Sequence, residues 1–65
     1  MKPPSDIALS PGDWYEVVTT HPLIAGRVVA VFCGVDRGDP VFDINGTDYT
    51  IPWEAITSIK FKRKG

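Results

Sequence analysis

The sequence predicts an all-β protein: one small five-stranded barrel with a one-turn 3₁₀-helix before its last strand. Apolar residues recur at strand spacing in short runs separated by turn residues. Asn45-Gly46 joins two of these runs, and this pair is typical of a tight type I′ hairpin because both central residues need positive φ. Pro52 ends the fourth run, and Trp53 to Ala55 are too few for an α-helix but enough for one 3₁₀ turn.

The length of 65 residues allows a single domain, residues 1–65, with a marginal core. Residues 1–6 carry Pro3-Pro4 and are expected to form an extended arm, and residues 63–65 are expected to fray. One cysteine excludes an internal disulfide, and one histidine with it cannot complete a nitrogen–sulfur metal cage. Self-association is therefore the expected source of further stability.

Five strands are expected, at residues 14–20, 23–33, 41–44, 47–51 and 58–62. The second is the longest apolar segment, and both of its faces are largely apolar, whereas a strand of a small barrel should have one polar face. Two explanations remain open: the strand bends so that its halves cover different things, or its outer face meets another subunit. Gly26 and Gly34 suit bending and bulging. In the last strand, Ile59 and Phe61 should point inward and Lys60 and Lys62 outward.

Charge is unevenly distributed along the chain, although the net charge is only −1. Four of the seven basic residues stand in the last six positions, namely Lys60, Lys62, Arg63 and Lys64. This basic end predicts phosphate contacts, which release counterions and depend strongly on salt; the alternative is a solvated tail that keeps an edge strand from aggregating. Trp53 is the favoured aromatic for base stacking, because a 3₁₀ turn presents its side chain at the barrel mouth.

No catalytic pattern is present, so we expect no enzyme activity and no cofactor. His21 precedes a proline in a loop and has no second histidine or nucleophile beside it. The segment from Asp43 to Asp48 has the wrong glycine spacing for a calcium loop, so we expect no metal. The chain has no apolar run of about 20 residues, Met1 to Asp6 lack the apolar stretch of a secretion signal, and the thiol is unpaired. These features favour a cytoplasmic location without membrane contact.

Two segments are similar to the Sm-like (LSm/Hfq-like) small β-barrel family: Glu54-Ala55-Ile56-Thr57-Ser58-Ile59 and Gly26-Arg27-Val28-Val29-Ala30-Val31-Phe32. The resemblance covers about half the chain and implies an SH3-like, Sm-like barrel. It also implies a homo-oligomeric ring, formed when the fourth strand of one subunit pairs with the fifth of the next, and binding of single-stranded RNA. The family's base-binding Asp has Phe32 near its position, and its Tyr-Lys-His is matched by Pro52-Trp53-Glu54, so those RNA contacts do not carry over.

A second resemblance, in Ile51-Pro52-Trp53-Glu54-Ala55-Ile56, is to PRC-barrel domains, which are partner-binding modules. The sequence therefore supports two hypotheses. The first is a non-enzymatic Sm-like module that binds nucleic acid, RNA above all, as a homo-oligomer through Trp53 and the basic end. The alternative is a protein-interaction or structural module that uses exposed apolar residues of the Leu23–Cys33 strand and binds no nucleic acid.

Overall fold

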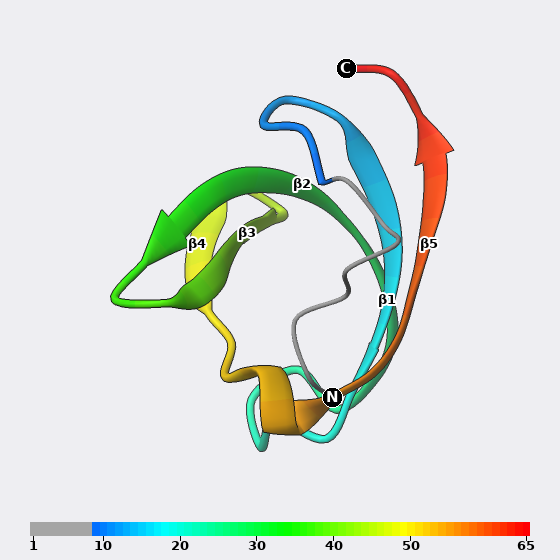
Figure 1. The fold of residues 1–65 in the computed structure, drawn as a ribbon. Coiled ribbons are helices and arrows are strands. Elements are labelled where there is room, and N and C mark those ends of the chain that lie inside the picture. Colours follow the sequence, from blue (N-terminus) through cyan, green and yellow to red (C-terminus); the bar gives the residue numbers. More distant parts are fainter. Residues whose placement is uncertain (1–8) are drawn as a thin grey trace.

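The computed structural model describes residues 9–65, so the arm expected at residues 1–6 lies outside the described part (Figure 1). Five strands and one short helix follow in chain order: β1 (Trp14–Thr19), β2 (Gly26–Asp36), β3 (Asp39–Ile44), β4 (Thr47–Thr50), the 3₁₀-helix η1 (Trp53–Ala55) and β5 (Ile56–Arg63). The expected all-β class, the number of strands and the position of the 3₁₀ turn are confirmed.

The strands form one antiparallel sheet in the order β4-β3-β2-β1-β5. The sheet is strongly curled, and the long strand β2 arches from the side of β1 and β5 toward β3 and β4 (Figure 1). Within residues 9–65, β4 and β5 do not pair with each other, so the curled sheet is open and has two free edges. One edge is β4, and the other is β5.

The long strand β2 bends, which was one of the two explanations for its apolar faces. Its first part, Gly26 to Val31, pairs with β1, and its second part, Val31 to Asp36, pairs with β3. A β-bulge between Phe32 and Gly34 separates the two parts, and Gly34 has a φ of 131°. A glycine is needed there because residues with a side chain rarely adopt this φ. The bend lets one strand cover two sides of the core.

The turn at Asn45-Gly46 is the predicted tight hairpin, since both residues have positive φ, 54° and 85°. Beyond β4, the Ile51 N–H still donates to the Pro40 carbonyl at 3.0 Å. The η1 turn is closed by the Ala55 N–H, which donates to the Pro52 carbonyl at 2.9 Å. A further bond from the Thr20 N–H to the Ala55 carbonyl, 2.7 Å, ties η1 to the end of β1.

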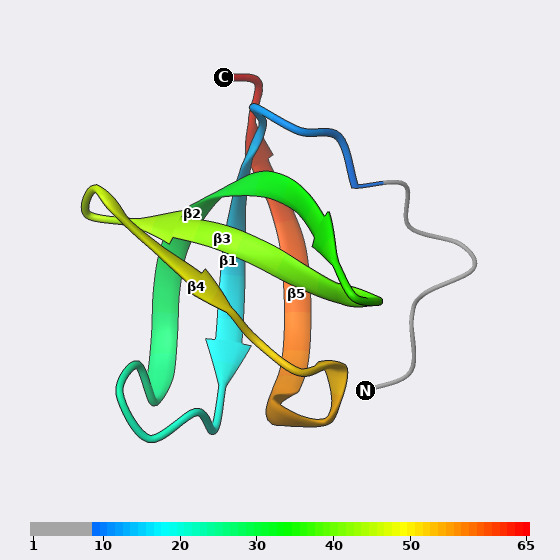
Figure 2. The ribbon, with the colours of Figure 1, turned by 90° about the vertical axis from the view of Figure 1, so that its left-hand side faces the viewer.

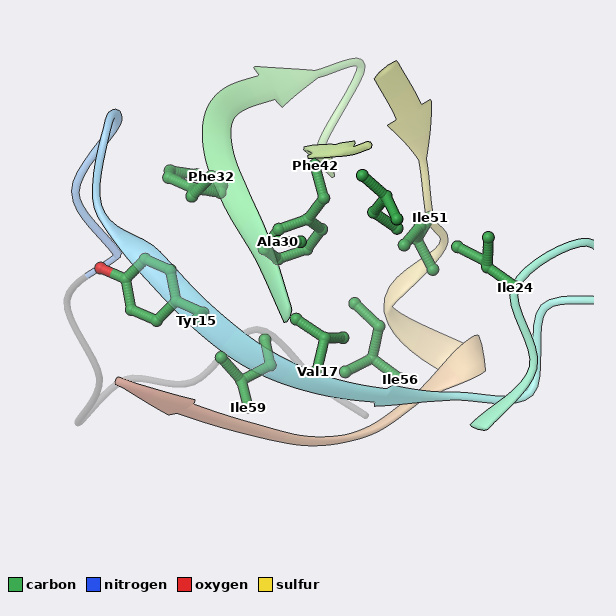
Figure 3. Close-up of a cluster of buried hydrophobic side chains, with 10 residues drawn as sticks. Tyr15, Val17, Ile24, Ala30, Phe32, Phe42, Ile51, Ile56 and Ile59 are labelled. Atoms are coloured by element: carbon green, nitrogen blue, oxygen red, sulfur yellow. The ribbon is translucent and has the colours of Figure 1, made fainter. Parts of the chain in front are cut away.

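The core lies on the concave side of the sheet, where buried side chains from β1, β2, β3, β5 and two connecting segments converge (Figure 3). It consists of Tyr15, Val17, Ile24, Ala30, Phe32, Phe42, Ile44, Ile51, Ile56 and Ile59. The alternation expected along β1 is confirmed, because Tyr15, Val17 and Thr19 are buried and the residues between them are not. Ile56 is buried as η1 passes into β5, as expected.

Phe61 differs from its expected burial. Its ring meets Tyr15 edge-on at 5.9 Å between centroids, so it stands on the core side, yet it is 59% exposed. The reason is its position on an edge strand, since β1 flanks β5 on one side and no described strand flanks it on the other. Ile59, two residues earlier, is 6% exposed.

Candidate nucleic-acid interface

The basic residues predicted as a site lie along the free edge formed by β5. Lys60, Lys62 and Arg63 belong to the strand and Lys64 follows it, and all four are exposed. We call this set the basic edge. It runs toward the C-terminal end of the molecule, which is the upper end in Figure 2. Four cations are thus exposed along one edge of the sheet.

A β-bulge in β5 decides which of these residues meets β1. Tyr15 pairs with Phe61 and Trp14 pairs with Arg63, so Lys62 is the extra residue of the bulge. Without the bulge, alternation would place Arg63 on the same face as Phe61. Instead Arg63 comes to the outer face, and its Cζ lies 4.8 Å from the centroid of the Trp14 ring. This is a cation–π contact between a guanidinium and an indole.

The neighbouring outer position on β1 carries Glu16, which faces two other cations. Glu16 is the cross-strand partner of Lys60, and its Oε1 lies 3.5 Å from the Arg27 Nε. The Glu16 carboxylate is thus paired with Arg27, and Lys60 is its cross-strand neighbour. Asp13 borders the basic edge as well, and its Oδ1 accepts the Gly65 N–H at 3.3 Å.

Trp53, the aromatic residue favoured from the sequence, lies at the other end of the molecule. Figure 2 shows η1 at the lower end and the C-terminus at the upper end. The eight residues of β5 separate them, a length of about 23 Å for an extended strand. The Trp53 Nε1–H donates to the Gly38 carbonyl at 2.8 Å, and its ring packs against the core.

The predicted site residues therefore do not form one cluster. The basic edge is joined by Trp14, and Trp53 stands apart from it. Sequence alternation alone could not reveal this, because the β5 bulge changes the face of Arg63 and leaves no clear mark in the sequence. The sequence holds one weak signal for the position of Trp14: the turn residues Gly12-Asp13 predict that a strand begins at Trp14.

Two carboxylates lie toward the opposite edge of the sheet, which is formed by β4. Asp43 on β3 and Asp48 on β4 are direct cross-strand partners, and the buried Asp43 Oδ1 has no hydrogen-bond partner among the described residues. The Cys33 Sγ lies 4.0 Å from the Asp48 Oδ1. The pKa of the Cys33 thiol is raised, chiefly because partial burial disfavours the thiolate and further because of the Asp48 charge. This thiol is thus less reactive than an ordinary one.

One row of cross-strand neighbours runs across the sheet from one free edge to the other. From the β4 edge to the β5 edge it consists of Asp48, Asp43, Val31, Trp14 and Arg63. The row is acidic at one free edge, apolar in the middle and basic at the other free edge.

The fold and this row define a small open β-sheet protein with two free edges of opposite charge. Comparison with protein-family models, curated proteins and solved structures finds no match for the chain. In residues 9–65 no three of the His, Cys, Asp and Glu side chains lie close enough together to hold a metal ion. The same part of the chain contains no helix long and apolar enough to cross a membrane.

Proposed function

We propose that this chain is a non-enzymatic module that binds single-stranded nucleic acid, RNA above all, and acts as a homo-oligomer of the Sm-like type. The observation that carries the proposal is the basic edge: four exposed cations on a free strand, with the indole of Trp14 beside them. Cations spaced along a strand suit a phosphate backbone, and an adjacent aromatic suits unpaired bases. The small SH3-like barrel and the Sm-like ending are the context expected from the sequence.

Removing cations from the basic edge tests the nucleic-acid part of the proposal. The double substitution Lys62→Gln with Lys64→Gln should weaken binding of a fluorescent single-stranded RNA and flatten its dependence on salt. If each lysine neutralises one phosphate, the slope of log K against log salt falls by about 1.4, because single strands lose about 0.7 per phosphate. Anisotropy titrations between about 50 and 200 mM NaCl measure this slope.

Arg27→Gln with Arg37→Gln is the matched control, since it removes the same charge from exposed positions outside the basic edge. The control should keep the slope of the parent chain. Absence of RNA binding by the parent chain at about 50 mM salt, where the electrostatic contribution is large, would rule the proposal out. An equal loss of RNA affinity in both double variants would show that the binding is non-specific charge attraction.

The two free edges support the homo-oligomer. In the hairpin of β3 and β4, the Ile51 N–H points toward β3, so the N–H groups of alternate residues, Asp48 and Thr50, point away from it. These groups are open to the β5 edge of another copy. Because β4 has four residues and β5 has eight, β4 can pair with the first half of β5, which has no basic residue, and leave the basic edge free for nucleic acid.

Thr50→Pro should block this association. Proline removes the outward N–H of Thr50 but none of the donors that point toward β3. Light scattering on a sizing column should give a parent mass several times the 7.1 kDa of one chain, and a mass near 7.1 kDa for the proline variant. Thr50→Val keeps the N–H and should keep the parent mass. A monomeric parent chain would refute the homo-oligomer and leave the nucleic-acid part standing.

A second candidate function, docking of a protein partner, is favoured by exposed apolar side chains on and before β2. Leu23 is 77% exposed and Val29 is 45% exposed. Val29 lies on the outer face opposite Glu16, so a partner there would contact an apolar surface bordered by charge. A monomeric chain that binds no RNA would favour this function.

A further inference from the structure

Arg63 and Trp14 form a cation–π pair at the basic edge. The Arg63 Cζ lies over the indole at 4.8 Å, and Arg63 is exposed. A guanidinium is planar and can be stacked on both of its faces, whereas an ammonium cannot. Trp14 is the one aromatic residue among residues 9–65 whose ring Arg63 contacts in this way.

The surrounding charges leave Arg63 available to a ligand. Within residues 9–65, the carboxylate of Glu16 is paired with Arg27, and no ion pair involves Arg63. Asp13 is the nearby acid, and its Oδ1 accepts the Gly65 N–H. Lys62 and Lys64 flank Arg63 in the chain and are exposed. Arg63 thus has an exposed cation on each side of it in the chain.

We propose that a nucleobase of single-stranded nucleic acid stacks on Arg63 and extends the stack begun by Trp14, while Lys62 and Lys64 contact the flanking phosphates. The inference rests on the proposed function and names the place and the chemistry of base contact. Single strands are selected because the faces of bases in a duplex are covered by their neighbours. Trp53, whose indole N–H is bonded to Gly38 at the far end of the molecule, is not the platform in this arrangement.

Arg63→Lys is the decisive variant, since it keeps the charge and removes the plane. Binding of an oligouridine of about twelve nucleotides should weaken about tenfold, as the loss of one stacked base predicts. The slope against salt should stay that of the parent chain, because the number of cations is unchanged. Arg27→Lys makes the same exchange on the outer face away from the stack and should bind as the parent does.

Intrinsic fluorescence separates the two tryptophans. A Trp53→Phe chain reports from Trp14 alone, and a Trp14→Phe chain reports from Trp53 alone. Oligouridine should change the emission of the first chain and leave that of the second unchanged, and a blunt RNA duplex of the same length should change neither. Arg63→Lys in the Trp53→Phe chain should reduce the change.

The outcomes distinguish this inference from the proposed function. Salt-dependent binding by the parent chain, with Arg63→Lys and Arg27→Lys both equal to it, would overturn the stack and leave the proposed function intact. A change in Trp53 emission with none in Trp14 emission would overturn the stack in the same way. Absence of oligouridine binding at about 50 mM salt would overturn both.

Discussion

Phe42→Ala is expected to remove a large part of the stability of the chain. Phe42 is 0% exposed and lies on the central part of the core, where its ring is 5.7 Å from that of Phe32. Truncating a fully buried phenylalanine costs about 3–5 kcal/mol of unfolding free energy, from lost burial and from the cavity left behind. A chain of this size has only about 3–10 kcal/mol in total. Circular dichroism and urea titration at 25 °C measure the loss.

Phe61→Ala is the matched control, because the same truncation is made on the same side of the sheet at a residue that is 59% exposed. It should cost about 1 kcal/mol and leave the chain folded. If Phe42→Ala is too unstable to titrate, Phe42→Leu keeps most of the volume and should cost about 1–2 kcal/mol. An equal loss of unfolding free energy in the Phe42→Ala and Phe61→Ala variants would contradict the described core.

Gly34→Ala is expected to destabilise the bent strand β2. Gly34 has a φ of 131°, and a methyl group built there meets no atom within 4 Å. Steric crowding is thereby excluded. The expected loss of about 1–3 kcal/mol in the free energy of unfolding therefore comes from backbone strain alone. Urea unfolding of the variant and the parent chain measures the difference.

A D-alanine at position 34 provides the control with the same atoms. The mirror-image residue favours positive φ, so it should keep or slightly raise the stability of the parent chain. A chain of 65 residues is short enough for chemical synthesis of this variant. Destabilisation by D-alanine as large as that by L-alanine would show that the β2 bulge does not depend on the backbone conformation described for Gly34.

The fold class could be predicted because each strand carries a local signal. Apolar alternation placed all five strands, and the pairs Asn45-Gly46 and Pro52-Trp53 placed the hairpin and the 3₁₀ turn. The ends of the strands were less accurate. β2 begins at Gly26 rather than Leu23 and continues to Asp36, because tertiary pairing with β3 carries it past the bulge.

The arrangement of the site could not be predicted from the sequence because it depends on the β5 bulge and on the direction of β5. The sequence placed Lys60 and Lys62 on the last strand and Arg63 in a frayed end. It could not bring Arg63 to Trp14, since strict alternation in a longer strand would give Arg63 the face of Phe61. It also could not place Trp53 relative to the basic edge, because that separation follows from the direction of β5. Whether the sheet closes depends on the pairing of distant strands, for which no local signal exists.

The position of β5 in the sheet affects how the chain folds during its synthesis. The pairings β1–β2, β2–β3 and β3–β4 join consecutive strands, but β5 must pair with β1, at the other end of the described chain. Closing so long a loop is slow relative to forming hairpins. During synthesis one edge of β1 therefore stays uncovered until β5 has been made. A nascent chain halted before Ile56 would expose Val17 and the adjoining backbone, a template for aggregation that the finished protein conceals.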